Sequence, residues 1–119
     1  MTLPRTMRFS GRSEVRALAR RGRRFETELG KIVWGRTSSP AAARLLFIIS
    51  TRVAKRSTER NRIRRQLGES FRREWAAVPF PAAVMVYVHP AVVAMPGSQR
   101  RALAAALAQR LRRVCLSSV

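Results

Sequence analysis

The sequence contains no aspartate, and His89 and Cys115 are its only histidine and its only cysteine. A Ser-His-Asp or Cys-His catalytic arrangement needs an orienting partner that is scarce here, and a pair of acid–base histidines is impossible. Zinc sites require several Cys or His ligands. The chain is therefore poorly supplied for hydrolytic chemistry of its own, and we expect His89 and Cys115 to be packing residues.

Other absences bear on the cellular compartment. Cys115 has no second cysteine in the chain with which to form a disulfide, which fits a reducing cytosol. The first eight residues lack the apolar core of a signal peptide, and no hydrophobic run approaches the roughly 20 residues of a membrane span. We therefore expect a cytoplasmic protein with no membrane contact.

Negative charge is also scarce, since six glutamates face 25 Lys and Arg residues and the net charge is +19. A charge of this size disfavours the compact state by self-repulsion, so a polyanionic partner is the natural explanation. The 46% hydrophobic content argues against a disordered basic tail. We expect residues 1–119 to form a single nucleic-acid-binding domain with its own core.

The most informative stretch runs from Arg60 to Trp75. On a helix, Ile63, Leu67, Phe71 and Trp75 recur every fourth position and form one apolar stripe. The opposite side is dominated by arginine, whose planar guanidinium suits phosphates and base edges. This segment is therefore predicted to be a helix that is anchored on one side and contacts nucleic acid on the other. Its polar side carries Asn61, Arg62, Arg65, Arg72 and Arg73.

The first half of the chain predicts one helix followed by strands. Ser10 or Ser13 caps a helix that runs to about Arg21 and ends at Gly22. Extended structure is predicted from Phe25 to Arg36, with a bulge or break at Gly30 where the alternation of apolar residues shifts phase. Leu45–Ile49 is predicted to be a central strand that is buried on both faces.

The second half adds two helices around one strand. Ser57 or Thr58 caps the Arg-rich helix, which ends before Pro79, and residues 83–88 form a strand. A last helix follows Pro96. The predicted fold is α+β, with helices packed on a single-layer sheet in the order α-β-β-β-α-β-α. Five arginines of the last helix form either a solvated face or further binding surface: Arg100, Arg101, Arg110, Arg112 and Arg113.

At several places the chain resembles the protein subunit of bacterial ribonuclease P. The most specific part is the Arg-Asn-Arg segment, in which residues 50–55 precede Arg60-Asn61-Arg62-Ile63-Arg64-Arg65. Supporting but more generic matches are Glu69-Ser70-Phe71-Arg72, Arg21-Gly22, and the strand from Val84 to Pro90. The resemblance covers nearly the whole chain in order and size.

The resemblance implies a fold with a rare left-handed βαβ crossover and a large catalytic RNA as partner. That ribonucleoprotein removes the 5′ leader of precursor tRNA, with the catalytic Mg²⁺ ions on the RNA, no cofactor on the protein and one protein per RNA. The expected RNA-binding residues are Arg52, Lys55, Arg56, Arg60, Asn61, Arg62, Arg64 and Arg65.

A second site implied by the resemblance is a cleft between the first helix and one sheet face, through which the leader passes. Single-stranded RNA favours aromatic platforms with positive charge nearby. Our candidates are Phe9, Val15, Lys31 and Trp34, although the two aromatic residues could instead be core residues. Val15 and Ala19 stand where members of the family commonly have aromatics, and the segment between Ser50 and Arg60 is one residue longer than is usual in the family.

Three other functions compete with this interpretation. A structural RNA-binding protein of ribosomal type would share the charge and the small size. A DNA-compacting protein would need a dimer arm or a DNA-reading helix pair, neither of which is recognisable. A protein-only nuclease would have to build its metal site from Glu26 and Glu28 without a visible third ligand.

Overall fold

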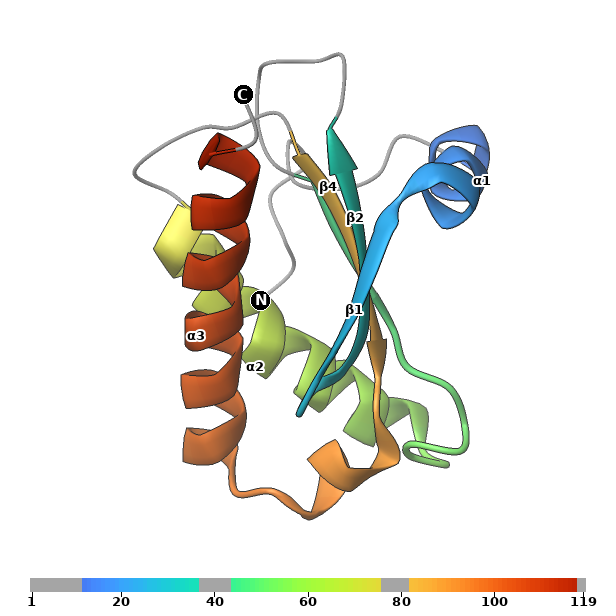
Figure 1. Ribbon diagram of the computed structural model, residues 1–119. Coiled ribbons are helices and arrows are strands. Elements are labelled where there is room, and N and C mark those ends of the chain that lie inside the picture. Colours follow the sequence, from blue (N-terminus) through green and yellow to red (C-terminus); the bar gives the residue numbers. More distant parts are fainter. Residues whose placement is uncertain (1–11, 37–43, 76–81, 118–119) are drawn as a thin grey trace.

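In the computed structural model, the described residues are 12–36, 44–75 and 82–117. They form one four-stranded sheet and three α-helices, together with a short 3-10 helix (Figure 1). In chain order the elements are α1 (Arg12–Arg21), β1 (Arg23–Thr27), β2 (Gly30–Arg36), β3 (Arg44–Ile48), α2 (Ser57–Trp75), β4 (Ala82–Val88), η2 (Pro90–Ala94) and α3 (Gly97–Ser117). The predicted α+β class and the order α-β-β-β-α-β-α are confirmed.

The strands lie in the order β1-β2-β4-β3. β1 and β4 both pair antiparallel with β2, whereas β3 pairs parallel with β4. The parallel pair is joined through α2, so β3, α2 and β4 form the βαβ unit that the resemblance implies; its left-handedness stays a prediction. Figure 1 shows α2 and α3 on one face of the sheet and α1 on the other.

The break predicted near Gly30 is a hairpin turn. β1 ends at Thr27, which pairs with Gly30, and the chain reverses between them. Thr27 Oγ1 accepts hydrogen bonds from the backbone N–H groups of Leu29 and Gly30, at 3.2 and 3.3 Å. Gly30 has a φ of +142°, and a Cβ there would lie 1.9 Å from the Tyr87 carbonyl oxygen. Only glycine therefore fits this close approach of β2 to β4.

The prediction that Leu45–Ile49 is a central strand was wrong. The strand, β3, runs from Arg44 to Ile48 and lies at an edge of the sheet, while β2 and β4 are central. Leu45 and Phe47 are buried beneath α2 and α3, but Leu46 and Ile48 are only half-buried on the other face. Continuous apolar sequence does not separate these cases, because a short helix can partly cover the second face of an edge strand.

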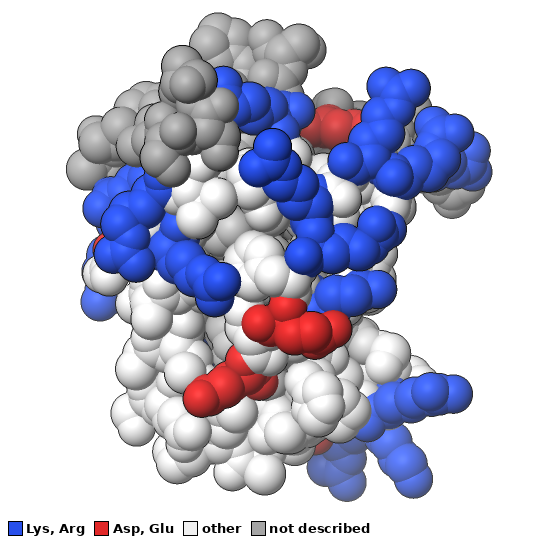
Figure 2. Space-filling model, in the orientation of Figure 1, with Lys and Arg blue, Asp and Glu red and all other residues white. Residues whose placement is uncertain are grey.

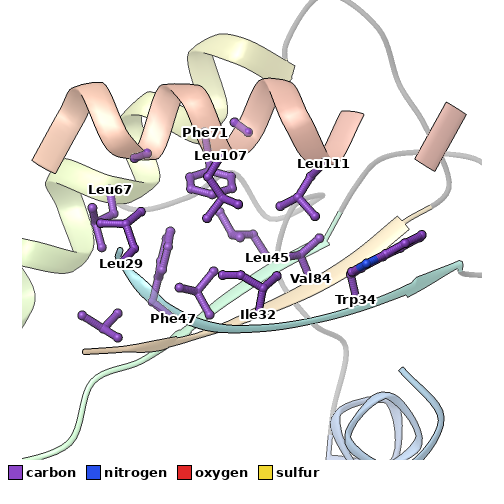
Figure 3. Close-up of a cluster of buried hydrophobic side chains, with 14 of the residues drawn as sticks. Leu29, Ile32, Trp34, Leu45, Phe47, Leu67, Phe71, Val84, Leu107 and Leu111 are labelled. Atoms are coloured by element: carbon purple, nitrogen blue, oxygen red, sulfur yellow. The ribbon is translucent and has the colours of Figure 1, made fainter. Parts of the chain in front are cut away.

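The larger core lies between the sheet and the pair α2 and α3 (Figure 3). The predicted apolar stripe of α2 enters it, since Ile63, Leu67 and Phe71 have no exposed surface. Burying each of these side chains contributes roughly 1.5–3 kcal/mol. Trp75 closes the stripe, and its Nε1 donates a 2.9 Å hydrogen bond to the Ala108 carbonyl oxygen of α3. The two helices are thus fixed to each other at the C-terminal end of α2.

The smaller core lies between α1 and the opposite sheet face. Leu18 of α1 packs with Val33, Ala83 and Met85. α1 begins at Arg12, so Ser13 is inside its first turn rather than before it, while Ser10 lies outside the described residues. The cores on the two faces of the sheet therefore differ in size, with a large core under α2 and α3 and a small one under α1.

Candidate RNA-binding surface

The connection between β3 and α2 positions the first group of predicted RNA-binding residues. The Ser50 carbonyl oxygen accepts hydrogen bonds from the N–H groups of Val53 and Ala54, at 3.0 and 3.3 Å, and both of these residues are buried. Arg52, Lys55 and Arg56 are exposed on either side of this buried pair. The apolar anchors hold the turn against the core and leave the three cations facing solvent.

Arg60 joins this connection to the helix that follows it. Its Nη1 donates 2.8 Å hydrogen bonds to the carbonyl oxygens of Ala54 and Lys55. Arg60 is half-buried, whereas the other seven predicted RNA-binding residues are exposed. Its first role is therefore to hold the turn against α2.

The outer side of α2 carries the remaining predicted residues. Asn61, Arg62, Arg64 and Arg65 are exposed, and Arg64 Nη1 donates a 2.8 Å hydrogen bond to Asn61 Oδ1. The amide of Asn61 neutralises no charge, so the arginines keep their full positive charge. The N-terminal end of α2 adds the partial positive charge of its backbone N–H groups, offset in part by Glu59 in the first turn.

The basic surface consists of these eight residues: Arg52, Lys55, Arg56, Arg60, Asn61, Arg62, Arg64 and Arg65. The structure brings all eight into the connection and the first half of α2. Arg72 and Arg73, farther along the helix, differ from this group. Arg73 is exposed and lies 3.7 Å from Glu69, while Arg72 is half-buried and its Nε is buried without a hydrogen-bond partner. The exposed arginine face is therefore concentrated in the N-terminal half of α2.

Figure 2 shows one face of the molecule, on which Lys and Arg gather in separate areas. One area lies where the connection enters α2, at the lower right, and another lies over α1 and the adjoining part of β1. Acidic side chains are visible near the middle of this face and toward its lower left. Glu26 of β1 and Glu28, which follows β1, are both exposed. Positive charge thus lies above and to the right of these acidic side chains instead of covering the whole face.

The structure separates the four residues predicted for the cleft beside the first helix. Phe9 lies outside the described residues. Val15 packs beside the smaller core, and Lys31 is exposed on the same sheet face as α1. Trp34 lies on the opposite face, where it is buried in the larger core and carries the Arg23 guanidinium 5.3 Å from its ring centre. Trp34 therefore does not belong to a cleft beneath α1.

The reason is the alternation of side chains along β2. Ile32, Val33 and Trp34 are all apolar, so the sequence does not say which of them faces α1. The structure turns Val33 toward α1 and its two neighbours away from it. The same alternation along β4 puts Ala83, Met85 and Tyr87 beneath or beside α1. Sequence reasoning missed Tyr87, because every second residue of an apolar strand is a candidate until one face is known.

The arginines of α3, for which the sequence allowed either a solvated face or a binding surface, have different environments. Arg100 is buried: its Nε and Nη2 donate to the carbonyl oxygens of Val92 and Val93, and its Nη1 donates to Gln66 Oε1, at 2.7–2.8 Å. It clamps η2 and α2 to α3 and is neither solvated nor a binding residue. Arg112 bonds the Glu74 carbonyl oxygen and Arg110 lies over Phe25, at 2.9 and 4.4 Å.

Cys115 and His89 are the side chains best suited to chemistry on the protein itself, and each has a structural role instead. Burial raises the pKa of the Cys115 thiol to about 11, so at neutral pH it is a protonated packing group. His89, which we expected to be a packing residue, is exposed, and its Nδ1 accepts a 3.0 Å hydrogen bond from Ala91 N at the start of η2. Within residues 12–36, 44–75 and 82–117, no three His, Cys, Asp or Glu side chains cluster as metal ligands.

Together these features define a small α+β protein with an arginine-rich helix exposed beside an open sheet. The sequence matches the Ribonuclease P family over residues 3–112, and the chain belongs to that family. A curated relative, the ribonuclease P protein component of Rippkaea orientalis, is 32% identical over 76 residues. That alignment spans 60% of this chain and 60% of the relative, so less than two thirds of the relative's length is covered.

Solved structures agree on the fold. The RNase P protein of Staphylococcus aureus superposes with a TM-score of 0.78 at 14% identity, covering 92% of this chain and 97% of that one. The RNase P protein of Thermotoga maritima gives a TM-score of 0.73 at 18% identity, covering 87% and 96%. No helix of the described residues is long and apolar enough to span a membrane.

Proposed function

We propose that this chain is the protein subunit of a ribonucleoprotein ribonuclease P, in which a partner RNA cleaves the 5′ leader from precursor tRNA. Membership of the Ribonuclease P family supports the assignment. The single observation that carries it further is the two-sided α2, with a fully buried apolar stripe beneath exposed arginines. A helix fixed in this way presents its guanidinium groups at defined positions, which suits binding to a folded RNA.

In this proposal the basic surface binds the catalytic RNA. Its exposed arginines provide charge-assisted hydrogen bonds to phosphates, and Asn61 holds Arg64 by the 2.8 Å bond described above. The side of the sheet beneath α1, with Val15 and Lys31, contacts the leader of the precursor. The chain has no aspartate and a single histidine, which supports a division of labour in which the RNA binds the catalytic Mg²⁺. One protein per RNA and a cytoplasmic location complete the proposal.

The test is reconstitution of cleavage. The protein is mixed with a bacterial ribonuclease P RNA and a precursor tRNA, and the cleavage rate is followed as Mg²⁺ is lowered. We expect the protein to accelerate cleavage and to reduce the Mg²⁺ concentration that the RNA requires, because its cations neutralise phosphate repulsion. Absence of any stimulation across all Mg²⁺ and salt concentrations would reject the proposal and favour a structural protein of ribosomal type.

The chain offers a matched control for the role of the basic surface. The double variant Arg62→Ala and Arg65→Ala removes two positive charges from it, and the double variant Arg101→Ala and Arg113→Ala removes two from exposed positions on α3. Both variants have the same net charge. If the surface on α2 is the RNA site, only the first pair weakens binding to the RNA strongly; equal losses would mean that net charge alone determines binding.

A further inference from the structure

The inference concerns the β1 edge of the sheet, on the face that α2 and α3 cover. Arg23 of β1 pairs with Trp34 of β2, and Phe25 lies two residues farther along β1, so the three side chains share one face. Trp34 is buried in the larger core, and Phe25 is half-buried against it. This face is opposite α1, so it lies on the other side of the sheet from the residues proposed for the leader.

Two arginines lie over these rings. The guanidinium carbon of Arg23 is 5.3 Å from the centre of the Trp34 ring, and that of Arg110 on α3 is 4.4 Å from the centre of the Phe25 ring. A guanidinium over an aromatic face is attracted by the ring, which limits the orientations that the cation adopts. Both arginines are exposed, although one belongs to β1 and the other to the last helix. Tertiary packing therefore brings two oriented cations to one surface, and we call Arg23 and Arg110 the stacked arginines.

The stacked arginines make no ion pair with any carboxylate in the described part of the chain. The ion pairs found there involve other arginines, Arg44 and Arg73. Glu26, the acidic residue of β1, alternates with Phe25 along the strand and therefore lies on the opposite face. Two cations on one face without a counterion repel each other, and a bound polyanion relieves that repulsion.

The rings themselves are not available for stacking with a base. Trp34 has only 4% of its surface exposed, and a guanidinium already lies over each ring. What this surface presents to a partner is therefore the N–H groups at the edge of each guanidinium. These groups suit the paired oxygens of a phosphate, and phosphate contacts carry no sequence information.

The stacked arginines are separate from the basic surface. β1 lies at one edge of the sheet, whereas the connection that carries part of the basic surface starts from β3 at the other edge. In the upper part of Figure 2, Lys and Arg side chains lie on both sides of uncharged surface, away from the area at the lower right where the connection enters α2. An RNA that contacts both places gains affinity, because the second contact is intramolecular once the first has formed.

We propose that Arg23 and Arg110 form a second contact for the catalytic RNA, in which their guanidinium groups bind phosphates of a different RNA segment from the one on the basic surface. The inference rests on the proposed function. It gives a binding role to Arg110 of α3 and leaves the leader on the α1 side of the sheet. The contact is independent of base sequence, since the rings orient the cations and do not touch the bases.

The test replaces both stacked arginines by methionine, in the double variant Arg23→Met and Arg110→Met. Methionine keeps an apolar cover over the rings and removes the charge, so it separates RNA binding from mere shielding of the rings. The control, Arg101→Met with Arg113→Met, removes the same charge from exposed positions of α3 that lie over no described ring. We expect the first pair to weaken binding of the catalytic RNA by roughly 5- to 100-fold and to lower the salt slope by roughly one unit per arginine, and the control to do neither.

A lysine pair and a protection experiment identify the contact. Arg23→Lys with Arg110→Lys keeps the charges but loses the planar fork, so the salt slope should be retained while the affinity falls by roughly 2- to 10-fold. If the methionine pair does not fold, the lysine pair decides, and wild-type affinity in it rejects the contact. Hydroxyl-radical cleavage of the RNA should show two segments protected by the wild type, one of them exposed by the methionine pair and the other by Arg62→Ala with Arg65→Ala.

The outcomes separate this inference from the function on which it rests. If the folded methionine pair keeps wild-type affinity and protection, the arginines only shield the rings, and the second contact is rejected while the proposed function stands. Equal losses in the control pair, or exposure of the same segment that the basic surface protects, also reject it. If only binding of precursor tRNA weakens, the surface contacts the substrate and the inference is again overturned. If the wild-type protein neither binds nor stimulates the RNA, the proposed function fails and this inference fails with it.

Discussion

Arg64 donates a hydrogen bond from its Nη1 to the Oδ1 of Asn61, one turn earlier on α2, at 2.8 Å. Both residues are exposed on the basic surface. The amide therefore orients one guanidinium of an otherwise repulsive arginine cluster without reducing its charge. Residues that carry the charge of this surface and residues that hold those charges in place can therefore be changed separately.

Asn61→Ala should weaken binding of the catalytic RNA by about 2- to 12-fold, the equivalent of one hydrogen bond of roughly 0.5–1.5 kcal/mol. The slope of log affinity against log salt should stay the same, because no charge is removed. Filter binding over a series of salt concentrations measures both quantities. A change in slope with Asn61→Ala would mean that Asn61 acts through the charges rather than through orientation.

Arg62→Ala should change both quantities. Each lost phosphate contact lowers the salt slope by roughly one unit and reduces affinity at low salt. The free energy of unfolding should change by less than about 0.5 kcal/mol, since Arg62 is exposed. An unchanged slope together with a large loss of stability would place Arg62 in the scaffold instead of the binding surface.

Leu67→Ala tests the buried side of the same helix. Leu67 has no exposed surface and packs in the larger core, so the truncation should cost about 2–5 kcal/mol of unfolding free energy. Chemical denaturation of the free protein measures this loss. RNA affinity measured under conditions where the variant is fully folded should remain close to that of the wild type, and a direct loss of affinity would contradict the two-sided helix.

Arg60→Ala should loosen the connection before α2. Arg60 is bonded to the carbonyl oxygens of Ala54 and Lys55, and removing these bonds leaves the turn with fewer contacts to the helix. We expect faster tryptic cleavage after Lys55 and Arg56 in the variant than in the wild type. Arg62→Ala, which removes a neighbouring arginine without such bonds, is the control and should leave the cleavage rate unchanged.

Cys115 predicts a pH dependence of stability. Burial raises the pKa of its thiol to about 11, above the ordinary value of 9.0, so the folded state disfavours the thiolate. The resulting stabilisation is complete below about pH 9 and is lost as the pH rises toward 11. The difference in unfolding free energy between wild type and Cys115→Ala should therefore decrease from pH 8 to pH 11. A constant difference would mean that the thiol is not desolvated.

Much of the fold could be predicted because local patterns and tertiary packing agree. The stripe of Ile63, Leu67, Phe71 and Trp75 is buried as its four-residue spacing predicted. The break near Gly30 was also recognisable, and the structure adds its cause, a hairpin turn in which only glycine fits against Tyr87. Local conformation and amphipathic spacing are encoded within a few residues, so the sequence alone is sufficient for them.

What the sequence did not reveal is which face of the sheet a side chain occupies and which distant residues surround it. Leu45–Ile49 was identified as a strand, but the apolar run did not reveal its edge position. For Trp34 the sequence left open a place in the cleft beside the first helix or in the core, and it lies in the core on the far side of the sheet. Arg100 was treated as a surface residue although it is buried among three hydrogen bonds. Each of these properties depends on residues that are distant in sequence.

The sequence by itself determined the charge, the scarcity of aspartate, histidine and cysteine, the order of the elements and the two-sided character of the arginine-rich helix. These follow from composition and from the 3.6-residue period of a helix. Only the tertiary structure decided which side chains share a sheet face, which arginines are held by backbone oxygens, and that Arg23 and Arg110 lie over aromatic rings on one face of the sheet. Strand pairing sets those relationships, because a side chain's face depends on its register with a neighbouring strand.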